Sequence, residues 1–214
     1  MTRKSPMAQK DIGNKIPLHT LNSTDQVRQF YDEWAEDEKY DRDMVDWNYT
    51  GPSEAVRTII RYAKRRDILI FDAGCGTGLV GKELHKAHYC NIDGADLSQN
   101  SLDSVSEGIY RKLWRVDLNE KIPITDNFYD AVICVGTFTY GHLKPIVLEE
   151  FVRITKRKGW ICFTVNEGIY ESHGFDKKIK ELASKSSWKT IEFFKSDYLA
   201  SKDVNAWLGL FQVV

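Results

Sequence analysis

The sequence has little of what marks a membrane-spanning, secreted or polyanion-binding protein. Its 214 residues contain no apolar run long enough to cross a bilayer, and the N-terminal segment MTRKSPMAQKDIGNKIPL lacks the apolar stretch of a secretory signal. A formal net charge of −1 gives no general attraction to phosphate backbones, although it leaves room for a local basic patch. We therefore expect a cytoplasmic protein that is not anchored to a membrane, with the nucleus as a further location.

Paired cysteine motifs are also absent. The four cysteines are Cys75, Cys90, Cys134 and Cys162, and none of them forms a C-x-x-C pair. Three of them lie in or beside apolar runs of the kind that form strands. This arrangement predicts reduced thiols that pack as small apolar groups, and it predicts no metal site.

The composition is that of a folded globular chain, with 42% hydrophobic and 29% charged residues. We expect a polar, flexible tail over residues 1–20 and one domain over residues 21–214. Within that domain, residues 21–50 are predicted to form helices with apolar residues at helical spacing. This segment also holds a dense acidic run: Asp25, Asp32, Glu33, Glu36, Asp37, Glu38, Asp41, Asp43 and Asp46. Most such runs are solvated helix surface, but here they would also repel a polyanion.

The remaining chain alternates between two hydrophobic periods. After a helix over 51–65, the pattern predicts strands at 68–74, 89–96, 112–117, 129–136 and 159–166, with helices at 79–87, 98–108 and 144–157. Strands that alternate with helices favour an α/β sheet with parallel core strands and helices on both faces. The last two apolar runs, 187–199 and 206–214, have no full helix between them and predict an antiparallel hairpin at one edge. The expected fold is thus a seven-stranded, mostly parallel sheet.

A glycine-dense turn follows the first predicted core strand. In FDAGCGTGLV, Gly74, Gly76 and Gly78 stand between an apolar run and a helical one, where the missing Cβ atoms let backbone approach a ligand. The G-x-G-x-x-G pattern of dinucleotide-binding proteins is not met, because Leu79 stands where the third glycine belongs, and no P-loop lysine follows. Both observations weigh against a pyrophosphate ligand.

The same turn resembles the first motif of class I S-adenosylmethionine-dependent methyltransferases, (D/E)-x-G-x-G-x-G. The resemblance implies a Rossmann-like fold in which this turn wraps the methionine part of the cofactor, through Asp72, Ala73, Gly74, Cys75, Gly76 and Gly78. The chemistry agrees, because a carboxylate at the strand end suits a ligand that carries a sulfonium and an ammonium. A turn that only connects strand and helix is the alternative.

The next strands each end in a residue that the resemblance uses. Asp96, with Leu97 after it, ends the second strand, where a carboxylate can accept hydrogen bonds from both ribose hydroxyls. By resemblance, Asp117 holds the adenine amino group beside Leu118. The fourth strand, by the same resemblance, borders the cofactor through Cys134, Val135 and Gly136. A helix cap for Asp96 and a turn role for Asp117 are the structural alternatives.

The segments FYDEWAEDEKYDRDM, FDAGCGTGLVGKEL, GADLS and FYDAVICVGTF together resemble the small methyltransferase-like family encoded in the Williams–Beuren syndrome critical region. The resemblance implies that the N-terminal helices fold over the cofactor as a lid. It places Tyr31, Trp34 and Tyr40 at the aromatic positions of that lid, and Tyr49 near the methionine carboxylate. Simple packing of these aromatic side chains on the sheet is the alternative, and for Trp34 the two interpretations weigh about equally.

Methyl transfer requires chiefly that the acceptor be held close to the methyl group and that water be excluded, so a general base is optional. The Asp/Asn-Pro-Pro-Tyr motif of amino-methylating nucleic-acid and protein enzymes is missing after the fourth strand, as is a Pro-Cys nucleophile. On the acceptor side the fold is expected to place Tyr31, Tyr140, His142, Asn166, Glu167 and Tyr170. Among them, His142 and Tyr140 are the catalytic candidates, and an exposed loop histidine without a role is the alternative.

The sequence therefore predicts a monomeric methyltransferase that converts S-adenosyl-L-methionine to S-adenosyl-L-homocysteine while methylating a small-molecule or protein acceptor. A non-catalytic cofactor-binding protein that acts through a partner is the main alternative. An NAD-dependent oxidoreductase and an RNA methyltransferase are further alternatives, disfavoured by the glycine spacing and by the acidic segment respectively.

Overall fold

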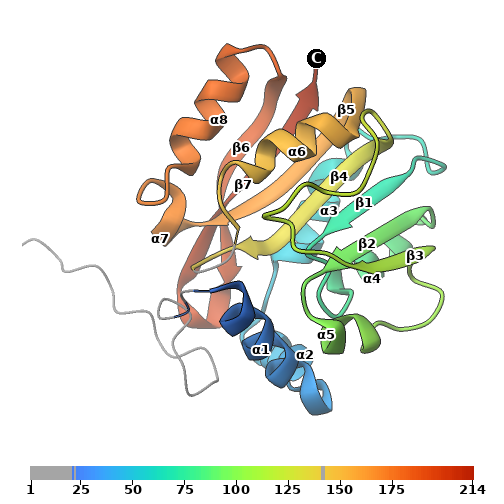
Figure 1. Cartoon of the computed structure of the whole chain (residues 1–214), viewed down its shortest axis with the longest axis vertical. Coiled ribbons are helices and arrows are strands. Elements are labelled where there is room, and N and C mark those ends of the chain that lie inside the picture. Colours follow the sequence, from blue (N-terminus) through green and yellow to red (C-terminus); the bar gives the residue numbers. More distant parts are fainter. Residues whose placement is uncertain (1–20, 22, 141–142) are drawn as a thin grey trace, which may run out of the picture.

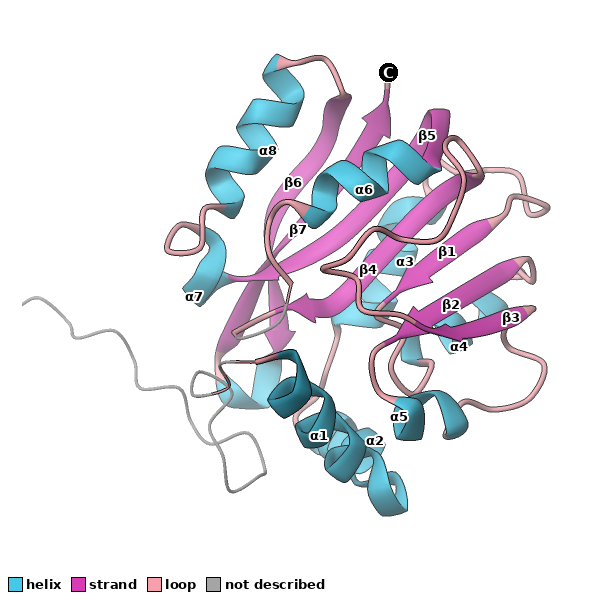
Figure 2. Ribbon diagram, in the orientation of Figure 1, coloured by secondary structure: helices cyan, strands magenta, loops and turns pink. Residues whose placement is uncertain are grey.

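A computed structural model describes residues 21, 23–140 and 143–214, and it confirms the predicted seven-stranded sheet. The strand order is β3-β2-β1-β4-β5-β7-β6, as Figures 1 and 2 show. The strands are β1 (Ile70–Ala73), β2 (Ile92–Asp96), β3 (Lys112–Arg115), β4 (Tyr129–Phe138), β5 (Thr155–Asn166), β6 (Trp188–Leu199) and β7 (Val204–Val213). Strands β1 to β5 pair in parallel, whereas β7 pairs antiparallel with both β5 and β6, so the predicted C-terminal hairpin is present.

Helices cover both faces of this sheet. The helices of the described residues are α1 (Thr24–Ala35), α2 (Lys39–Asp46), α3 (Gly51–Ile60), α4 (Leu79–Lys86), α5 (Gln99–Asp103), α6 (Val147–Ile154), α7 (Glu167–Tyr170) and α8 (Phe175–Ser184), with short 3-10 turns at Glu36–Glu38 and Ala200–Lys202. Apolar side chains of α6 and α8 form one core layer with the sheet, and those of α3 and α4 form the other. Burial on both faces explains why the parallel strands consist of continuous apolar runs.

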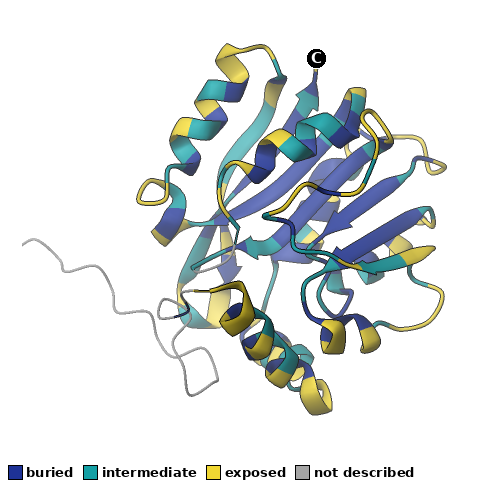
Figure 3. Ribbon diagram, in the orientation of Figure 1, coloured by how far each residue is buried: buried dark blue, intermediate teal, exposed yellow. Residues whose placement is uncertain are grey.

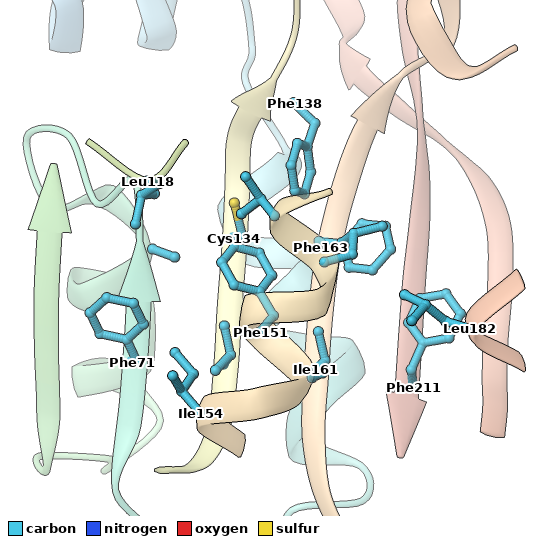
Figure 4. Close-up of a cluster of buried hydrophobic side chains, with 14 of the residues drawn as sticks. Phe71, Leu118, Cys134, Phe138, Phe151, Ile154, Ile161, Phe163, Leu182 and Phe211 are labelled. Atoms are coloured by element: carbon cyan, nitrogen blue, oxygen red, sulfur yellow. The ribbon is translucent and has the colours of Figure 1, made fainter. Parts of the chain in front are cut away.

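The larger core layer is rich in aromatic rings, and Figure 4 shows part of it. Phe163 stacks on Phe211 with ring centroids 5.0 Å apart, and Phe211 stacks on Trp188 at 4.3 Å. Figure 3 shows that burial is concentrated in the central strands, while the outer helix faces are exposed. The hairpin is therefore held to the parallel sheet by side-chain packing as well as by backbone hydrogen bonds.

Helices α1 and α2 lie across the carboxyl ends of the parallel strands (Figure 1). The Ser23 hydroxyl caps α1 by accepting a hydrogen bond from the Gln26 amide at 3.2 Å. Phe30 and Trp34 are buried between these helices and the end of the hairpin, in a small core of their own. The predicted helical lid is thus present, and it rests on β6 and β7 as well as on the glycine turn.

Several predicted boundaries were wrong. The helix predicted over 144–157 ends at Ile154, because Thr155 turns to an extended conformation, hydrogen-bonds back to the Phe151 carbonyl and begins β5. The helix predicted over 98–108 ends at Asp103, and the one predicted over 51–65 ends at Ile60. Helix α8 was missed, although Phe175, Ile179 and Leu182 face the core at helical spacing.

Cys75, Cys134 and Cys162 are buried, Cys90 is exposed, and none of the four forms a disulfide, as the sequence predicts. No helix in the described part of the chain combines the length and the apolarity needed to cross a membrane. Among residues 21, 23–140 and 143–214, no three His, Cys, Asp or Glu side chains are grouped to hold a metal ion.

The Phe211→Ala variant tests the contribution of the hairpin to the core. Because this ring is fully buried against two others, its loss should lower the free energy of unfolding by about 3–5 kcal/mol. The matched control is Phe128→Ala, whose ring is 43% exposed and whose loss should cost no more than about 1 kcal/mol. Urea denaturation of both variants checks the difference, and equal costs would contradict the packing described here.

Candidate functional site

The glycine turn joins β1 to α4 in a conformation that requires glycine. Gly74 has a φ of +76°, and a Cβ there would lie 2.3 Å from the Thr137 hydroxyl oxygen. The amides of Gly74 and Cys75 both donate to the Ala95 carbonyl on β2, at 2.8 and 3.0 Å. The turn is therefore held between the ends of β2 and β4, and its shape is fixed by contacts from both sides.

A cavity opens beside this turn, between the carboxyl ends of the strands and the lid. The space between the lining residues measures about 820 Å³, a figure that includes open solvent. Its lining includes these predicted residues: Tyr31, Tyr40, Gly74, Gly76, Asp96, Leu97, Asp117, Leu118, Val135 and Gly136. It also includes residues that were not predicted: Thr24, Val27, Arg28, Thr77, Ser98, Ser101, Val116, Asn119, Thr137 and Leu143.

Asp96 lies at the tip of β2 and fixes two neighbouring segments. One carboxylate oxygen accepts from the Gly76 amide and the other from the Ser98 amide, both at 2.9 Å. Burial raises the pKa of this carboxyl, while hydrogen bonds from the Ser98 and Gly76 amides lower it. These two bonds join the glycine turn to the start of α5. Each oxygen retains a lone pair, so the carboxylate can also accept hydrogen bonds from hydroxyl groups of a ligand in the cavity.

Asp117 lines the cavity just beyond the end of β3. One of its oxygens accepts from the Asn119 amide at 2.9 Å, which makes it a turn residue as well as a lining residue. Asn119 in turn accepts from the Lys144 amide at 3.1 Å. Asp117 can therefore both stabilise the turn after β3 and contact a ligand in the cavity.

Asp72 lies beneath the glycine turn, outside the cavity lining. Its side chain is fully buried, and one oxygen accepts from the Tyr110 hydroxyl at 2.6 Å. The other oxygen has no hydrogen-bond partner among the described residues. Tyr110, whose hydroxyl also accepts from the Gly81 amide at 3.1 Å, is a supporting residue that the sequence analysis missed.

The other predicted cofactor residues lie around the cavity rather than in its lining, namely Trp34, Tyr49, Ala73, Cys75, Gly78 and Cys134. Trp34 is 2% exposed and donates its indole N–H to Asp43 at 2.7 Å, which agrees with the packing alternative. Cys134 is fully buried in the core, and this burial raises the pKa of its thiol.

Two aspartates of the acidic run fasten the lid to the cofactor-side loops. Asp32 on α1 accepts from the Ser98 hydroxyl at 2.6 Å, and its carbonyl accepts from the Asn100 side chain at 3.2 Å. Asp41 on α2 accepts from the Thr77 hydroxyl and pairs with Lys82 at 3.2 Å. The acidic run is therefore more than solvated surface, and these two contacts close the lid over the cavity.

The predicted acceptor-side residues are only partly brought together. Tyr140 is half-buried, with its ring centroid 6.0 Å from that of His173. Asn166 caps α7 by accepting from the Gly168 amide, and Glu167 pairs with Lys195 at 2.6 Å. Tyr170 lies against Trp207 and Phe193 on the sheet. The other catalytic candidate, His142, lies outside the described residues.

The Asp72→Asn variant tests the electrostatics under the turn. Burial raises the pKa of Asp72 to about 7 from its ordinary value of 3.8. Because the folded pKa is the higher one, the protonated carboxyl stabilises the fold at low pH, and this contribution is lost as the pH rises through about 7. Relative to the wild type, Asp72→Asn should therefore gain stability between about pH 4 and pH 8, by at most about 4 kcal/mol.

Urea denaturation at a series of pH values measures this gain, with the exposed Asp103→Asn as the control. A stability difference between Asp72→Asn and the wild type that stays constant over this pH range would show that Asp72 does not titrate there.

Comparisons with known proteins agree with this geometry. Residues 71–163 match the methyltransferase domain family. The chain is 27% identical over 208 residues to human methyltransferase-like protein 27, covering 90% of this chain and 83% of that protein.

Solved structures of methyltransferases share the fold. The magnesium protoporphyrin IX methyltransferase of Synechocystis, solved with bound S-adenosylmethionine, superimposes with a TM-score of 0.67 at 14% identity, over 91% of this chain and 98% of that one. A chain from the complex of the Haloferax volcanii Trm112 methyltransferase activator with a methyltransferase gives a TM-score of 0.67 at 17% identity, over 87% of this chain and 97% of that one. The glycine turn, the cavity at the carboxyl ends of the strands and these similarities together support a class I S-adenosylmethionine-dependent methyltransferase.

Proposed function

We propose that this protein binds S-adenosylmethionine in the cavity beneath the lid and methylates a small-molecule or protein acceptor. The observation that carries the proposal is the Asp96 carboxylate, which is oriented by the Gly76 and Ser98 amides and lines the cavity beside the glycine turn. A carboxylate at the end of the second strand is placed to accept hydrogen bonds from a ribose.

The polar groups along the cavity suit the successive parts of the cofactor. Asp117 and Leu118 would hold the adenine, Asp96 the ribose hydroxyls, and the turn at Gly74 and Gly76 the methionine part. The partnerless oxygen of Asp72 lies below this turn. A nearby cation favours the ionised form of such a buried carboxyl, so a sulfonium and an ammonium would be stabilised there.

When bound, the cofactor supplies an electrophilic methyl group on its sulfonium. The residues of this chain then have to hold the acceptor in line with that methyl group and exclude water from the cavity. Tyr31 and Tyr40 belong to the lid and line the cavity, and the contacts of Asp32 and Asp41 hold the lid in place. No general base is required of the protein if the acceptor arrives as a nucleophile.

The alternative is that the protein binds the cofactor without catalysis and acts through a partner. The Trm112 complex concerns a methyltransferase together with its activator, so a partner that enables activity is a related case. Cofactor binding without methylated product, both with and without candidate partners, would favour this alternative.

The Asp96→Ala variant tests the ribose contact. It should weaken S-adenosylmethionine binding by at least about 100-fold, because hydrogen bonds to an ionised carboxylate are among the strong ones. Isothermal titration calorimetry measures the dissociation constant, with Asp103→Ala as the matched control on the exposed side of α5 and NAD as the control ligand. A folded Asp96→Ala protein with wild-type affinity would rule out the assignment of Asp96 to the ribose.

Hydrogen–deuterium exchange tests the lid. Bound S-adenosylmethionine should slow exchange across residues 24–46 about tenfold, since a ligand that contacts the closed lid stabilises it. In the unliganded Asp41→Ala protein the same residues should exchange faster than in the wild type, while β6 and β7 stay unchanged. Equal exchange of residues 24–46 with and without cofactor would contradict the lid interpretation.

A further inference from the structure

Four tyrosines from separate parts of the chain meet beside the cavity, whose lining includes two of them, Tyr31 and Tyr40. Tyr31 lies on α1, Tyr40 on α2, Tyr49 in the linker before α3 and Tyr198 near the end of β6. The rings of Tyr49 and Tyr198 meet edge to face at 4.9 Å, and their hydroxyl oxygens are 3.2 Å apart. We call these four residues the tyrosine cluster.

The backbone makes room for this cluster at two glycines. A Cβ on Gly136 would lie 2.6 Å from the Tyr49 hydroxyl oxygen and 3.1 Å from that of Tyr198, and Gly136 lines the cavity. A Cβ on Gly51 would lie 2.6 Å from the Tyr49 ring. The two hydroxyls are therefore packed against the cavity wall at the end of β4.

Threonines at the ends of β4 and β5 orient the hydroxyls. The Thr164 side chain on β5 accepts from the Gly136 amide at 3.0 Å, and it lowers the pKa of the Tyr198 phenol. The Thr139 side chain, just after β4, hydrogen-bonds the Tyr31 hydroxyl. Tyr198 itself is fixed because its carbonyl accepts from the Thr50 amide at 3.2 Å.

The tyrosine cluster lies on the opposite side of the site from the glycine turn, Asp96 and Asp117. The strand order reverses between β1 and β4, and ligands of such sheets bind at that reversal (Figure 2). The glycine turn, Asp96 and Asp117 follow β1, β2 and β3, whereas the hydroxyls of the cluster lie at β4 and β5. The reacting groups must meet between these two halves.

Charge at this end of the cavity disfavours an anion. Besides burial, the Asp96 carboxylate raises the pKa values of Tyr31 and Tyr40, and the Asp41 carboxylate raises that of Tyr40. Tyr198 raises the pKa values of the other three phenols. Among the described lining residues the one cationic side chain is Arg28, and it is paired with Asp25 and Asp32 at 3.5 and 3.3 Å. A thiolate or carboxylate acceptor would find no unpaired cation in that described lining.

The phenols remain neutral hydroxyls at physiological pH. Burial raises the pKa of Tyr198 to about 12, and it raises those of Tyr31, Tyr40 and Tyr49 as well. They therefore supply no phenolate base, but their oxygens accept hydrogen bonds and their ring faces attract cations. A nucleophile that is already neutral, and whose positively charged form is tolerated, meets these conditions.

We propose that the tyrosine cluster is the methyl-acceptor subsite and that it selects an amine over an anionic acceptor. The proposal rests on the proposed function. In the transfer, the lone pair of the neutral amine nitrogen forms the new C–N bond, and the electron pair of the broken S–C bond stays on sulfur. The positive charge passes to nitrogen, which then releases a proton to water. The charge of the site is thus the same before and after the bond exchange.

A matched series of probes tests the subsite by binding alone. Ligand-observed NMR gives dissociation constants for benzylammonium, benzyl alcohol and benzoate with the protein loaded with S-adenosylhomocysteine, and again with the unliganded protein. Benzylammonium should bind most tightly and benzoate most weakly, with a difference of about threefold to thirtyfold between cation and neutral probe. Benzoate binding as tightly as benzylammonium would overturn the proposal.

Variants locate the binding. Tyr198→Phe, which keeps the ring and loses the hydroxyl, should weaken benzylammonium about threefold to tenfold and leave S-adenosylhomocysteine affinity within about twofold. Tyr129→Phe is the matched control, since it also removes a buried tyrosine hydroxyl. That hydroxyl donates to Asp93 at a distance of 3.1 Å, and neither residue lines the cavity. Equal losses for benzylammonium and S-adenosylhomocysteine in Tyr198→Phe would assign Tyr198 to the cofactor and overturn the proposal.

Further measurements identify the source of the amine and distinguish failure of the subsite proposal from failure of the proposed function. Nα-acetyl-lysine amide, with its free side-chain amine, represents a protein acceptor, whereas benzylammonium represents a small molecule. The probe that binds more tightly identifies the source. If the protein binds no S-adenosylhomocysteine, the proposed function fails, while the probe order on the unliganded protein still decides the selectivity of the tyrosine cluster. If the cofactor binds and the probe order is reversed, only the subsite assignment fails.

Discussion

The hydrogen bonds that Asp96 accepts from the Gly76 and Ser98 amides are the constraint on which the site depends. They join the glycine turn to the start of α5, and the lid is fastened to the same two loops. Asp32 contacts the Ser98 hydroxyl and Asp41 contacts the Thr77 hydroxyl. Because both oxygens of the Asp96 carboxylate accept from backbone amides, this one side chain fixes the two loops that the lid helices contact.

The C-terminal hairpin links the fold to the chemistry. It packs on the parallel sheet through Phe211 and Trp188, and its far end carries Tyr198 beside the cavity, where the Thr50 amide holds its backbone. In the same place Leu199 forms an isolated bridge with Tyr49, the residue that ends the lid. A hairpin that extends an edge of the sheet therefore also places the Tyr198 hydroxyl against Gly136, a residue of the cavity lining.

Prediction from the sequence succeeded where a pattern repeats locally and was weaker where contacts are distant. Asp96 was predicted because a carboxylate at the tip of a parallel strand lies at the ligand-binding edge of the sheet, and Asp117 was predicted from the family resemblance. Thr77, Thr137 and Ser98 were missed because small polar residues beside a motif give no periodic signal. The early end of α6 was mispredicted because Thr155 joins β5 through pairing with Tyr129, a contact distant in the sequence.

The sequence by itself determined the α/β class, the edge hairpin, the glycine turn and the acidic strand ends, since these follow from the hydrophobic period and from glycine's freedom at positive φ. Only the tertiary structure decided which acidic residues fasten the lid, that Trp34 is buried and donates to Asp43, and that Asp72 is buried beneath the turn beside Tyr110. It alone brought Tyr49 and Tyr198 together across 149 positions of sequence. Such pairs depend on strand order and helix packing, which are properties of the whole folded chain.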